Sequence, residues 1–468
     1  MKDCYEYHIK TSHTYESVRR PHFLDWSNYP SPFKFYEGVR RFRLLPFIAV
    51  TQETIDTLYR ICLQGAVESL SLQEISNLAF SMNGITKVEN FHGETFGFRT
   101  TPSAGALYPF ELYLFIRDLT EIPDGIYHYQ PYDHTLELLS EGNYFESLQT
   151  ALCTTVETNC VAVITAIYER SAWKYRDRAF RYCLLDIGHM VSNGVVYLKS
   201  VGLETTALSL FNDDSVNELL GVDGEREFSL CALIPEKPAL FWGEESYPPE
   251  KFPETLPVLR KPVRSELIEK VYKLSKMDNC EFFRDIPESE GPFPEVSSLP
   301  ISKVIKKRRS RRGFTGKFIS FDEFRFIVES SLLCFPSDWG FPKCNFFIQV
   351  RNVNGVPDGV YTVVDGSLTL VERGNFGREM AYLCLGQSFV SRANMNVVFT
   401  YRFSDGNCRD YRGALIEAGA LGENLYLSSE SLNLGACGIG AFYDFELQRF
   451  LNLESNELPV YVVSVGSL

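Results

Sequence analysis

The chain has 468 residues, of which 45% are hydrophobic and 14% aromatic, and its formal net charge is −14. Its length and apolar content allow more than one buried core, whereas its acidity argues against nucleic-acid binding, which relies on many phosphate contacts. The first residues, MKDCYEYHIK, lack the apolar core of a signal peptide, and no apolar run approaches the ~18 residues of a membrane-spanning helix, so a cytoplasmic protein is predicted.

The first half of the chain alternates between predicted helices and strands. SLQE at Ser71 contains the serine and glutamate of a capping box, which marks a helix start. Strands follow, then a long helix whose apolar residues cover a broad face, then a closing strand. The expected strands are ELYLFIRD (111–118), CVAVITAIY (160–168) and EFSLCALI (227–234), with a hairpin between the first two, and the long helix covers roughly 178–201.

The second half has the same order of elements. SFDE at Ser320 is again a capping-box start. Strands interleaved with long helices predict an α+β sandwich of helices packed against a mixed sheet. The expected strands are NFFIQVRN (345–352), MNVVFTY (395–401) and LPVYVVSVG (458–466), and the long helix covers roughly 409–432.

The two halves also repeat each other in detail. IPDGIYHY from Ile122 returns as VPDGVYTV from Val356. An ungapped shift of 231 residues aligns several positions, among them Arg181 with Arg412, Gly188 with Gly419 and Asp213 with Asp444. This period is far longer than that of a solenoid repeat, so a duplicated domain is predicted, with the two copies paired as an internal pseudo-dimer.

A proline-rich segment separates the copies. Residues 235 to 300 contain 11 of the 23 prolines, which is typical of a linker, with one short helix expected near SELIEKVYKLSK. The predicted organisation is an amino-terminal domain over 1–235, a linker over 236–300 and a carboxy-terminal domain over 301–468. The 12 cysteines form no CxxC pair and the seven histidines show no ligand spacing, so no metal site is predicted.

The run VIKKRRSRRGF, residues 304–314, places six positive charges in seven positions of this acidic chain. One interpretation is a solvated basic face or a nucleic-acid patch. If residues 308 to 312 are extended, however, Arg308, Ser310 and Arg312 lie on the same side of the strand. Two guanidinium groups and a hydroxyl suit one phosphate monoester, which favours a small phosphorylated ligand.

Several motifs carry a resemblance to a known family. RRSRRGF before a capping-box helix, with LGACGIGAF before VYVVSVG, resembles the flavin-mononucleotide (FMN) nitroreductase superfamily. RTTPSAGALYPFELYLF, WKYRDRAFRYCLLDIGHMVSN and YHIKTSH with LDWSNYPSPFKFY are similar to its azoline-oxidising branch, the SagB-type dehydrogenases, in tandem form. The resemblance covers nearly the whole chain apart from the linker. The absence of GxGxxG argues against a resident nicotinamide on a Rossmann fold.

The resemblance implies a flavin site shared between the two copies, with one FMN per chain. The amino-terminal copy has HIKTS and TTALSL where the other copy has its basic and glycine-rich segments, and the carboxy-terminal copy has PSDWGFPK in place of PSAGALYP, so one complete site is expected. The implied cofactor residues are Arg308, Ser310 and Arg312 for the phosphate with Arg309 and Arg311 as supporting charge, Gly438, Ile439 and Gly440 facing the flavin edge, and the loop of Pro102, Ser103, Ala104 and Gly105.

Lys174 and Tyr175 in WKYRDRAFRY are the implied catalytic pair, with the lysine as the base and the tyrosine orienting the ring or sharing the proton. The second copy reads NCRDY there, without a lysine. The structural alternative is a surface lysine, a packing tyrosine, a Pro-Gly turn at PSAGALYP and a close-packing turn at GACGIGAF.

The resemblance implies an FMN-dependent enzyme that oxidises azoline rings, thiazoline or oxazoline, in a peptide or carrier-bound precursor. Two alternatives stay open from the sequence. One is a general NAD(P)H-dependent reductase of nitro compounds or quinones, and the other is a non-catalytic subunit that docks a peptide or a partner. The expected partners are a small-molecule or peptide substrate and a cyclodehydratase or carrier protein that delivers it, with no nucleic acid and no membrane.

Overall fold

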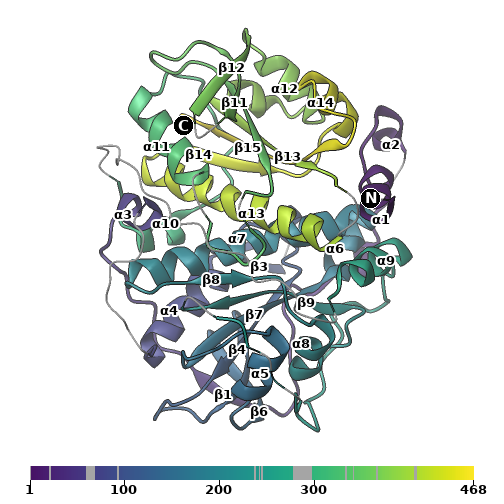
Figure 1. Ribbon diagram of the computed structural model, residues 1–468, viewed down its shortest axis with the longest axis vertical. Coiled ribbons are helices and arrows are strands. Elements are labelled where there is room, and N and C mark those ends of the chain that lie inside the picture. Colours follow the sequence, from purple (N-terminus) through teal and green to yellow (C-terminus); the bar gives the residue numbers. More distant parts are fainter. Residues whose placement is uncertain are drawn as a thin grey trace.

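The chain forms two lobes with a pair of long helices between them (Figure 1). The computed structural model describes residues 2–20, 23–59, 69–91, 94–236, 239–241, 243, 246–277, 298–332, 335–340, 342–364, 367–404 and 408–468. None of the helices in these ranges is long and apolar enough to cross a membrane.

The first lobe is built on a sheet whose order, within the described residues, is β1-β6-β5-β4-β7-β9-β8. Its central strands are buried on both faces because successive side chains point to opposite sides, so that Leu112 and Leu114 enter one core cluster and Tyr113 and Phe115 another. The strands are β1 (Arg40–Arg43), β4 (Phe110–Ile116), β5 (Gly125–Gln130), β6 (Thr135–Glu141), β7 (Cys160–Ile167), β8 (Thr206–Leu208) and β9 (Glu227–Ile234).

The second lobe repeats this sheet in the order β12-β11-β10-β13-β15-β14, with no counterpart of β1 in the part of the chain that the structure describes. The duplicated α+β fold predicted from the repeat is thereby confirmed. All strand pairs recorded within both large sheets are antiparallel, so the expectation of a mixed sheet is wrong. The strands are β10 (Asn345–Val350), β11 (Gly359–Val364), β12 (Ser367–Arg373), β13 (Met395–Arg402), β14 (Gly435–Ile439) and β15 (Glu457–Gly466).

The sheet is antiparallel because of how its strands are connected. A meander joins β4, β5 and β6, and the chain then returns through α5 (Phe145–Leu152) to place β7 beside β4 in the opposite direction. The alternation of helices and strands in the sequence does not specify the direction of that return. Pattern alone therefore identified the strands but not their pairing.

Helices α7 (Ala179–Ser200) and α13 (Cys408–Ser431) pack against each other between the two sheets. At their crossing, a Cβ on Gly188 would collide with the Ile416 carbonyl, and one on Gly419 would collide with the Leu185 carbonyl. The two glycines are aligned in the sequence repeat and allow this close backbone approach in both directions. The contact is therefore isologous, as in a symmetric dimer, but it forms within one chain.

Two buried charge clusters join the copies reciprocally. Arg178, directly before α7, and Arg181 of α7 each donate to the Asp444 carboxylate, at 2.9 Å. In the mirror arrangement, Arg409 and Arg412 of α13 donate to Asp213, at 2.5 and 2.6 Å. The two clusters lie in register with the 231-residue shift. Each acid begins a short helix, α8 (Asp213–Leu220) or α14 (Asp444–Phe450).

Two segments that flank the sheet of the first copy, one before it and one after it, pack against the lobes. In the first, α1 (Lys2–Lys10) packs on the second lobe, with a hydrogen bond of 3.0 Å between His8 Nδ1 and the Tyr411 hydroxyl. The proline-rich segment contains the expected short helix, α9 (Glu266–Ser275). Upstream of α9, the backbone at 254–258 pairs with that at 31–37, so this part of the segment lies along the first lobe.

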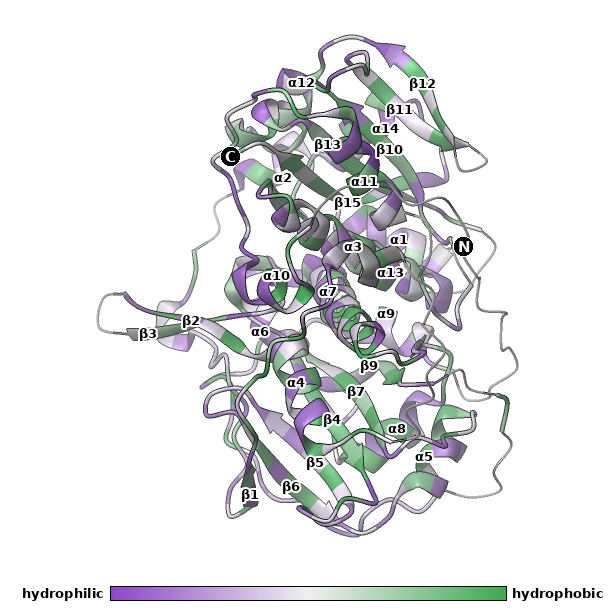
Figure 2. Ribbon diagram, turned by 90° about the vertical axis from the view of Figure 1, so that its left-hand side faces the viewer, coloured by the Kyte–Doolittle hydropathy of each residue, from purple (hydrophilic) through white to green (hydrophobic). Residues whose placement is uncertain are grey.

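A two-stranded ribbon of β2 (Ile85–Phe91) and β3 (Glu94–Arg99) projects from the first lobe (Figure 2). Both predicted capping boxes are confirmed by reciprocal hydrogen bonds between Ser71 and Glu74 and between Ser320 and Glu323. The remaining helices are α2 (Tyr15–Arg19), α3 (Thr54–Tyr59), α4 (Leu72–Asn83), α6 (Tyr168–Tyr175), α10 (Ile301–Lys307), α11 (Phe321–Leu332) and α12 (Gly377–Leu383).

Candidate active site

One pocket is lined by residues of both copies. It combines the loop Pro102–Gly105 from the first copy with Ser310, Arg312 and the segment 438–440 from the second. These are most of the cofactor positions expected from the sequence. The rest of the lining is made by Tyr175, Tyr182, Leu185, Asp186, His189, Gln387, Tyr426, Ala441 and Tyr461.

The loop from the first copy has an unusual backbone conformation. Gly105, Ala106 and Tyr108 all have positive φ, at 65°, 54° and 47°. Such angles strain residues with a Cβ, and strain of this kind concentrates at functional sites. A Cβ on Gly105 would lie 2.7 Å from the Tyr175 hydroxyl and 3.2 Å from Lys174 Nζ. Glycine thus lets the loop backbone contact the predicted catalytic pair.

Asp186 of α7 holds this loop in place through hydrogen bonds. Its carboxylate accepts hydrogen bonds from Ser103 Oγ at 2.6 Å and from the Ala104 N–H at 3.2 Å, and Ser103 Oγ in turn accepts from the Tyr108 N–H at 3.0 Å. Burial raises the pKa of Asp186 to about 8, against the opposing effect of these donors. An acid that retains a proton near neutral pH is a feature of many functional sites.

Asp186 is a functional position that the sequence reasoning did not identify. The signal was present in the repeat, because the shift of 231 residues aligns Asp186 with Glu417. Glu417 anchors a loop of the other copy in the same way, because its carboxylate accepts hydrogen bonds from the N–H groups of Lys343 and Cys344 at 2.8 and 2.9 Å. An acid on an apolar helix in both copies indicates a loop anchor.

The glycine-rich segment is held closely by aromatic hydroxyls. The Gly438 N–H donates to the Tyr426 hydroxyl at 2.6 Å, and a Cβ on Gly438 would collide with the Tyr461 hydroxyl. From the first copy, Arg178 Nη2 and the Tyr182 hydroxyl donate to the Gly440 carbonyl at 2.9 and 3.1 Å. The position of this segment therefore depends on contacts from both copies.

The basic cluster has two separate roles. Ser310 and the exposed Arg312 line the pocket, and Ser310 Oγ lies 2.9 Å from the Tyr426 hydroxyl. Arg308 is buried instead, outside the lining, and its Nε donates to the Thr100 carbonyl at 2.7 Å, just before the loop of the first copy. Arg309 is also outside the lining and donates to the Arg308 carbonyl at 2.6 Å.

A polar cluster forms part of the pocket wall and continues behind it, where Glu423 is buried. His189 lies 2.6 Å from Glu423 Oε2 through Nδ1 and 2.8 Å from the Tyr461 hydroxyl through Nε2. Glu423 Oε1 accepts no hydrogen bond among the described residues, and Arg308 Nε lies 3.6 Å from it. The Arg308 guanidinium thus lies between Glu423 and the Thr100 carbonyl, and Arg308 stays outside the pocket lining.

Lys174 and Tyr175 form the last turn of α6, which ends where Arg176 takes a positive φ of 51°. Lys174 is half-buried, and its Nζ lies 5.4 Å from the centre of the Tyr175 ring. The Tyr175 ring meets the Tyr182 ring edge-on, with centroids 4.7 Å apart. Burial raises the pKa of the Tyr175 phenol, so its hydroxyl stays protonated at neutral pH.

The mirror position of this pocket is filled by the chain itself. Ser209 and Leu210 correspond to Gly440 and Ala441, and their N–H groups both donate to the Asp338 carboxylate at 2.8 Å. The neighbouring Trp339 is buried and packs against Gly413. Asp338 and Trp339, two residues of the divergent loop PSDWGFPK, therefore occupy the second site.

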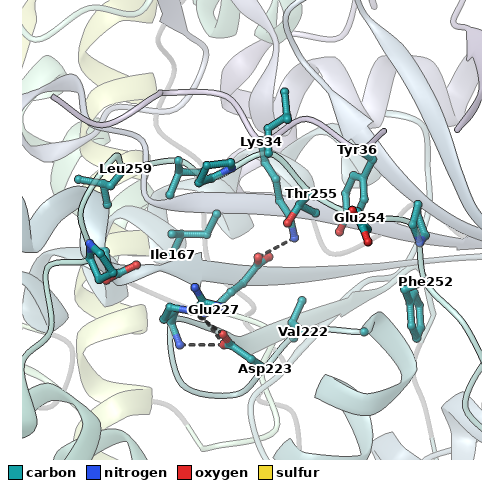
Figure 3. Close-up of a pocket in the computed structure, with 18 of the residues that line it drawn as sticks. Lys34, Tyr36, Ile167, Val222, Asp223, Glu227, Phe252, Glu254, Thr255 and Leu259 are labelled. Atoms are coloured by element: carbon teal, nitrogen blue, oxygen red, sulfur yellow. Dashed lines mark hydrogen bonds and ion pairs between the residues drawn. The ribbon is translucent and has the colours of Figure 1, made fainter. Parts of the chain in front are cut away.

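A larger cavity of about 610 Å³ lies in the first lobe under the segment 252–260 (Figure 3). Lys34 and Glu227 line it and are paired with each other at 2.6 Å, and the Tyr113 hydroxyl donates to Glu227 at 2.7 Å. The lining contains none of the site residues predicted from the sequence. Two ion pairs within its lining, Lys34–Glu227 and Arg226–Asp223, use four of its charges, so the pocket shared by the copies is the better candidate despite its smaller volume of about 170 Å³.

A comparison of the chain with known proteins gives a consistent result. The model of the nitroreductase family matches residues 49–234 and 305–467. A protein of Methanocaldococcus jannaschii described as a nitroreductase is 33% identical over 167 residues, which is 35% of this chain and 79% of that protein. A crystal structure described as a nitroreductase from Anabaena variabilis matches with a TM-score of 0.79 and 26% identity, covering 99% of this chain and 98% of that one.

Two proteins described as processing microcin B17 and trifolitoxin are also similar. The microcin B17-processing protein McbC of Escherichia coli is 30% identical over 134 residues, 27% of this chain and 49% of McbC. The trifolitoxin-processing protein TfxB of Rhizobium leguminosarum bv. trifolii is 27% identical over 144 residues, 29% of this chain and 39% of TfxB. The matched region thus spans less than half of either processing protein.

Proposed function

Because this chain belongs to the nitroreductase family, we propose that it is an FMN-dependent dehydrogenase that oxidises an azoline ring of a peptide or carrier-bound precursor to an azole. The observation that carries the proposal is the shared pocket. In it the loop at Ser103, the segment at Gly438, the phosphate-type donors Ser310 and Arg312 and the side chain of Tyr175 come together from four separate parts of the sequence. Lys174 lies outside the lining, with its Nζ 3.2 Å from where a Cβ on Gly105 would be.

The residues of the pocket suit FMN. Arg312 at the exposed mouth and Ser310 beside it offer a guanidinium and a hydroxyl for a phosphate monoester. Farther in, the segment 438–440 brings main chain to the pocket wall, and Tyr461 and Tyr182 pack so closely on Gly438 and Gly440 that no side chain would fit there. The enclosed volume is below the ~300–1,000 Å³ that is usual for ligand sites, so the phosphate end is proposed to extend through the mouth.

Oxidation of an azoline removes two electrons and two hydrogens from the ring. FMN, when bound, supplies the acceptor for the hydride. We assign to Lys174 Nζ the role of accepting the proton from the ring carbon. We assign to the protonated Tyr175 hydroxyl the role of orienting the ring by donating a hydrogen bond. Asp186 keeps the Ser103 loop against this pair through its two hydrogen bonds.

The peptide-processing relatives support a peptide as substrate and a cyclodehydratase as the partner that delivers it. The match to the M. jannaschii nitroreductase favours a second candidate, a general NAD(P)H-dependent flavin reductase, which would use the same pocket without Lys174. Aerobic conversion of a synthetic thiazoline peptide to its thiazole, followed by mass spectrometry as a loss of two hydrogens, tests the first proposal. Steady NADPH oxidation with no azole formed would favour the second.

One FMN per chain is the expected stoichiometry, because Asp338 and Trp339 fill the mirror position. Flavin released from the purified protein by heat can be quantified by absorbance against the protein concentration. A ratio near one is expected, whereas a ratio near two would show that the mirror position opens and that the site is not unique.

Replacing Arg312 by alanine is expected to weaken FMN binding by roughly ten- to a hundredfold, because a charge-assisted hydrogen bond contributes about 1.5–3 kcal/mol. The matched control is Arg311→Ala. Arg311 belongs to the same basic run but pairs with Glu430 at 3.2 Å, outside the pocket. Fluorescence titration of the apoproteins with FMN measures both. Equal losses in the two variants would show a general charge effect in place of a specific phosphate contact.

A further inference from the structure

A tryptophan beside the catalytic pair is exposed. Trp26 is 68% exposed and lies in a short 3-10 helix over Trp26–Asn28. Tryptophan is on average a well-buried residue because of its large apolar surface. Exposure of an indole at a fixed position therefore needs a reason.

The turn that carries Trp26 is firmly anchored. The Asp25 carboxylate accepts from the Ser27 N–H at 3.1 Å and from Ser27 Oγ at 2.6 Å. Asn28 exchanges two hydrogen bonds of 2.9 Å with the backbone of Lys261. The indole is thus presented by a structured turn.

Two aromatic neighbours support the indole. Tyr29 is stacked on Trp26 with centroids 5.9 Å apart and planes 13° from parallel, and Trp173 meets it edge-on at 5.3 Å and 73°. With one face stacked and most of its surface exposed, the indole keeps its other face open. A planar side chain in this state can stack on one further flat ring.

The same cluster leads directly to the proposed catalytic group. Trp173 immediately precedes Lys174, and its indole N–H donates to the Asp25 carbonyl at 2.9 Å. Trp173 also shares an apolar cluster with Leu107 of the pocket loop and with Tyr175. The buried Trp173 therefore connects the exposed indole of Trp26 with the pocket loop and the end of α6.

We propose that the open face of Trp26 is a stacking subsite for a planar heteroaromatic ring of the peptide substrate, an azole next to the azoline that is oxidised. The inference rests on the proposed function for the identity of the peptide. The same flat-ring chemistry is also present in the nicotinamide and adenine of NADPH. We assign the subsite to the peptide because an azoline placed at Lys174 brings its neighbouring residues to this surface.

The test uses the FMN-loaded protein and calorimetric titration with two synthetic peptides, one containing a thiazole and a matched one with glycine at that position. Trp26→Ala is expected to weaken binding of the thiazole peptide about three- to tenfold and to leave binding of the glycine peptide unchanged. Trp26→Phe, which keeps a ring, should stay within about twofold of the parent. The control is Phe23→Ala, since Phe23 is 89% exposed three residues earlier.

The binding assay needs no turnover, so it separates the subsite from the proposed reaction. Selective loss of the thiazole peptide in Trp26→Ala supports the subsite even if no azoline is oxidised. An unchanged affinity in Trp26→Ala, or an equal loss for both peptides, overturns it. A larger loss for NADPH than for the thiazole peptide would assign the platform to the nucleotide and overturn the peptide assignment. Melting temperatures should match across the variants because Trp26 is exposed.

Discussion

Replacing Lys174 by alanine is expected to slow azoline oxidation by about 10² to 10⁴-fold while the flavin absorbance of the protein stays unchanged, because a positioned base contributes that much to a proton transfer. The proposed cofactor contacts come from other residues, the nearest being the loop at Gly105, so losing the amine should not release FMN. Initial rates with a thiazoline peptide, together with the visible spectrum of each preparation, measure both effects.

Two further observations make the lysine experiment specific. Added methylamine should restore part of the rate of Lys174→Ala, since a small amine can enter the vacated space and accept the same proton. Tyr175→Phe should be milder if the phenol only orients the ring and comparably severe if its hydroxyl carries the proton. A Lys174→Ala enzyme that works at the parental rate would remove the lysine from the mechanism and favour the general flavin reductase.

Removing the acid from either buried charge cluster should lower the free energy of unfolding by about 3–5 kcal/mol, because two arginines lose their buried partner. Asp444→Ala and Asp213→Ala form a matched pair related by the repeat. Only the first should also lose FMN, since Arg178 bonds both Asp444 and the carbonyl of Gly440 in the pocket. Denaturant unfolding and FMN titration of both variants separate the two effects.

The pH dependence of this cluster can be stated with its sign. Burial by itself would raise the pKa of Asp444, but Arg178 and Arg181 outweigh it and hold that pKa well below the ordinary value. The stability contributed by Asp444 is therefore fully present above the ordinary pKa of an aspartate and is lost only as the pH falls towards the depressed value. Stability that is independent of Asp444 at neutral pH would contradict this account.

The sequence predicted the duplication, the main strands and the long helices because each left a periodic or repeated trace. The aligned pairs Gly188-Gly419 and Asp213-Asp444 are even the residues that join the copies, although alignment alone could not show that each glycine meets the backbone of the opposite helix. The sequence repeat shows which residues occupy equivalent positions in the two copies. Which of these residues touch each other is decided by how the copies pack in the pseudo-dimer.

Other features depended on tertiary contacts that no local pattern encodes. Arg308 was expected beside Ser310 and Arg312 in the pocket. It directly follows α10, which ends at Lys307, and its guanidinium donates to the Thr100 carbonyl outside the pocket lining. The ribbon of β2 and β3 was missed because neither strand packs on a core that would impose a clear apolar alternation. Asp186 was missed because a single acid within an apolar helix has no motif of its own.

The filled mirror position also affects how the two halves can vary. In a symmetric dimer every residue appears at two equivalent sites, so a change that improves one role is imposed on both. Here Asp338 and Gly105 belong to loops at corresponding places in the two copies. The loop with Asp338 fills the mirror position, whereas the loop with Gly105 lines the pocket. A substitution in this chain therefore alters one half-site alone, and the two copies are free to diverge at equivalent positions.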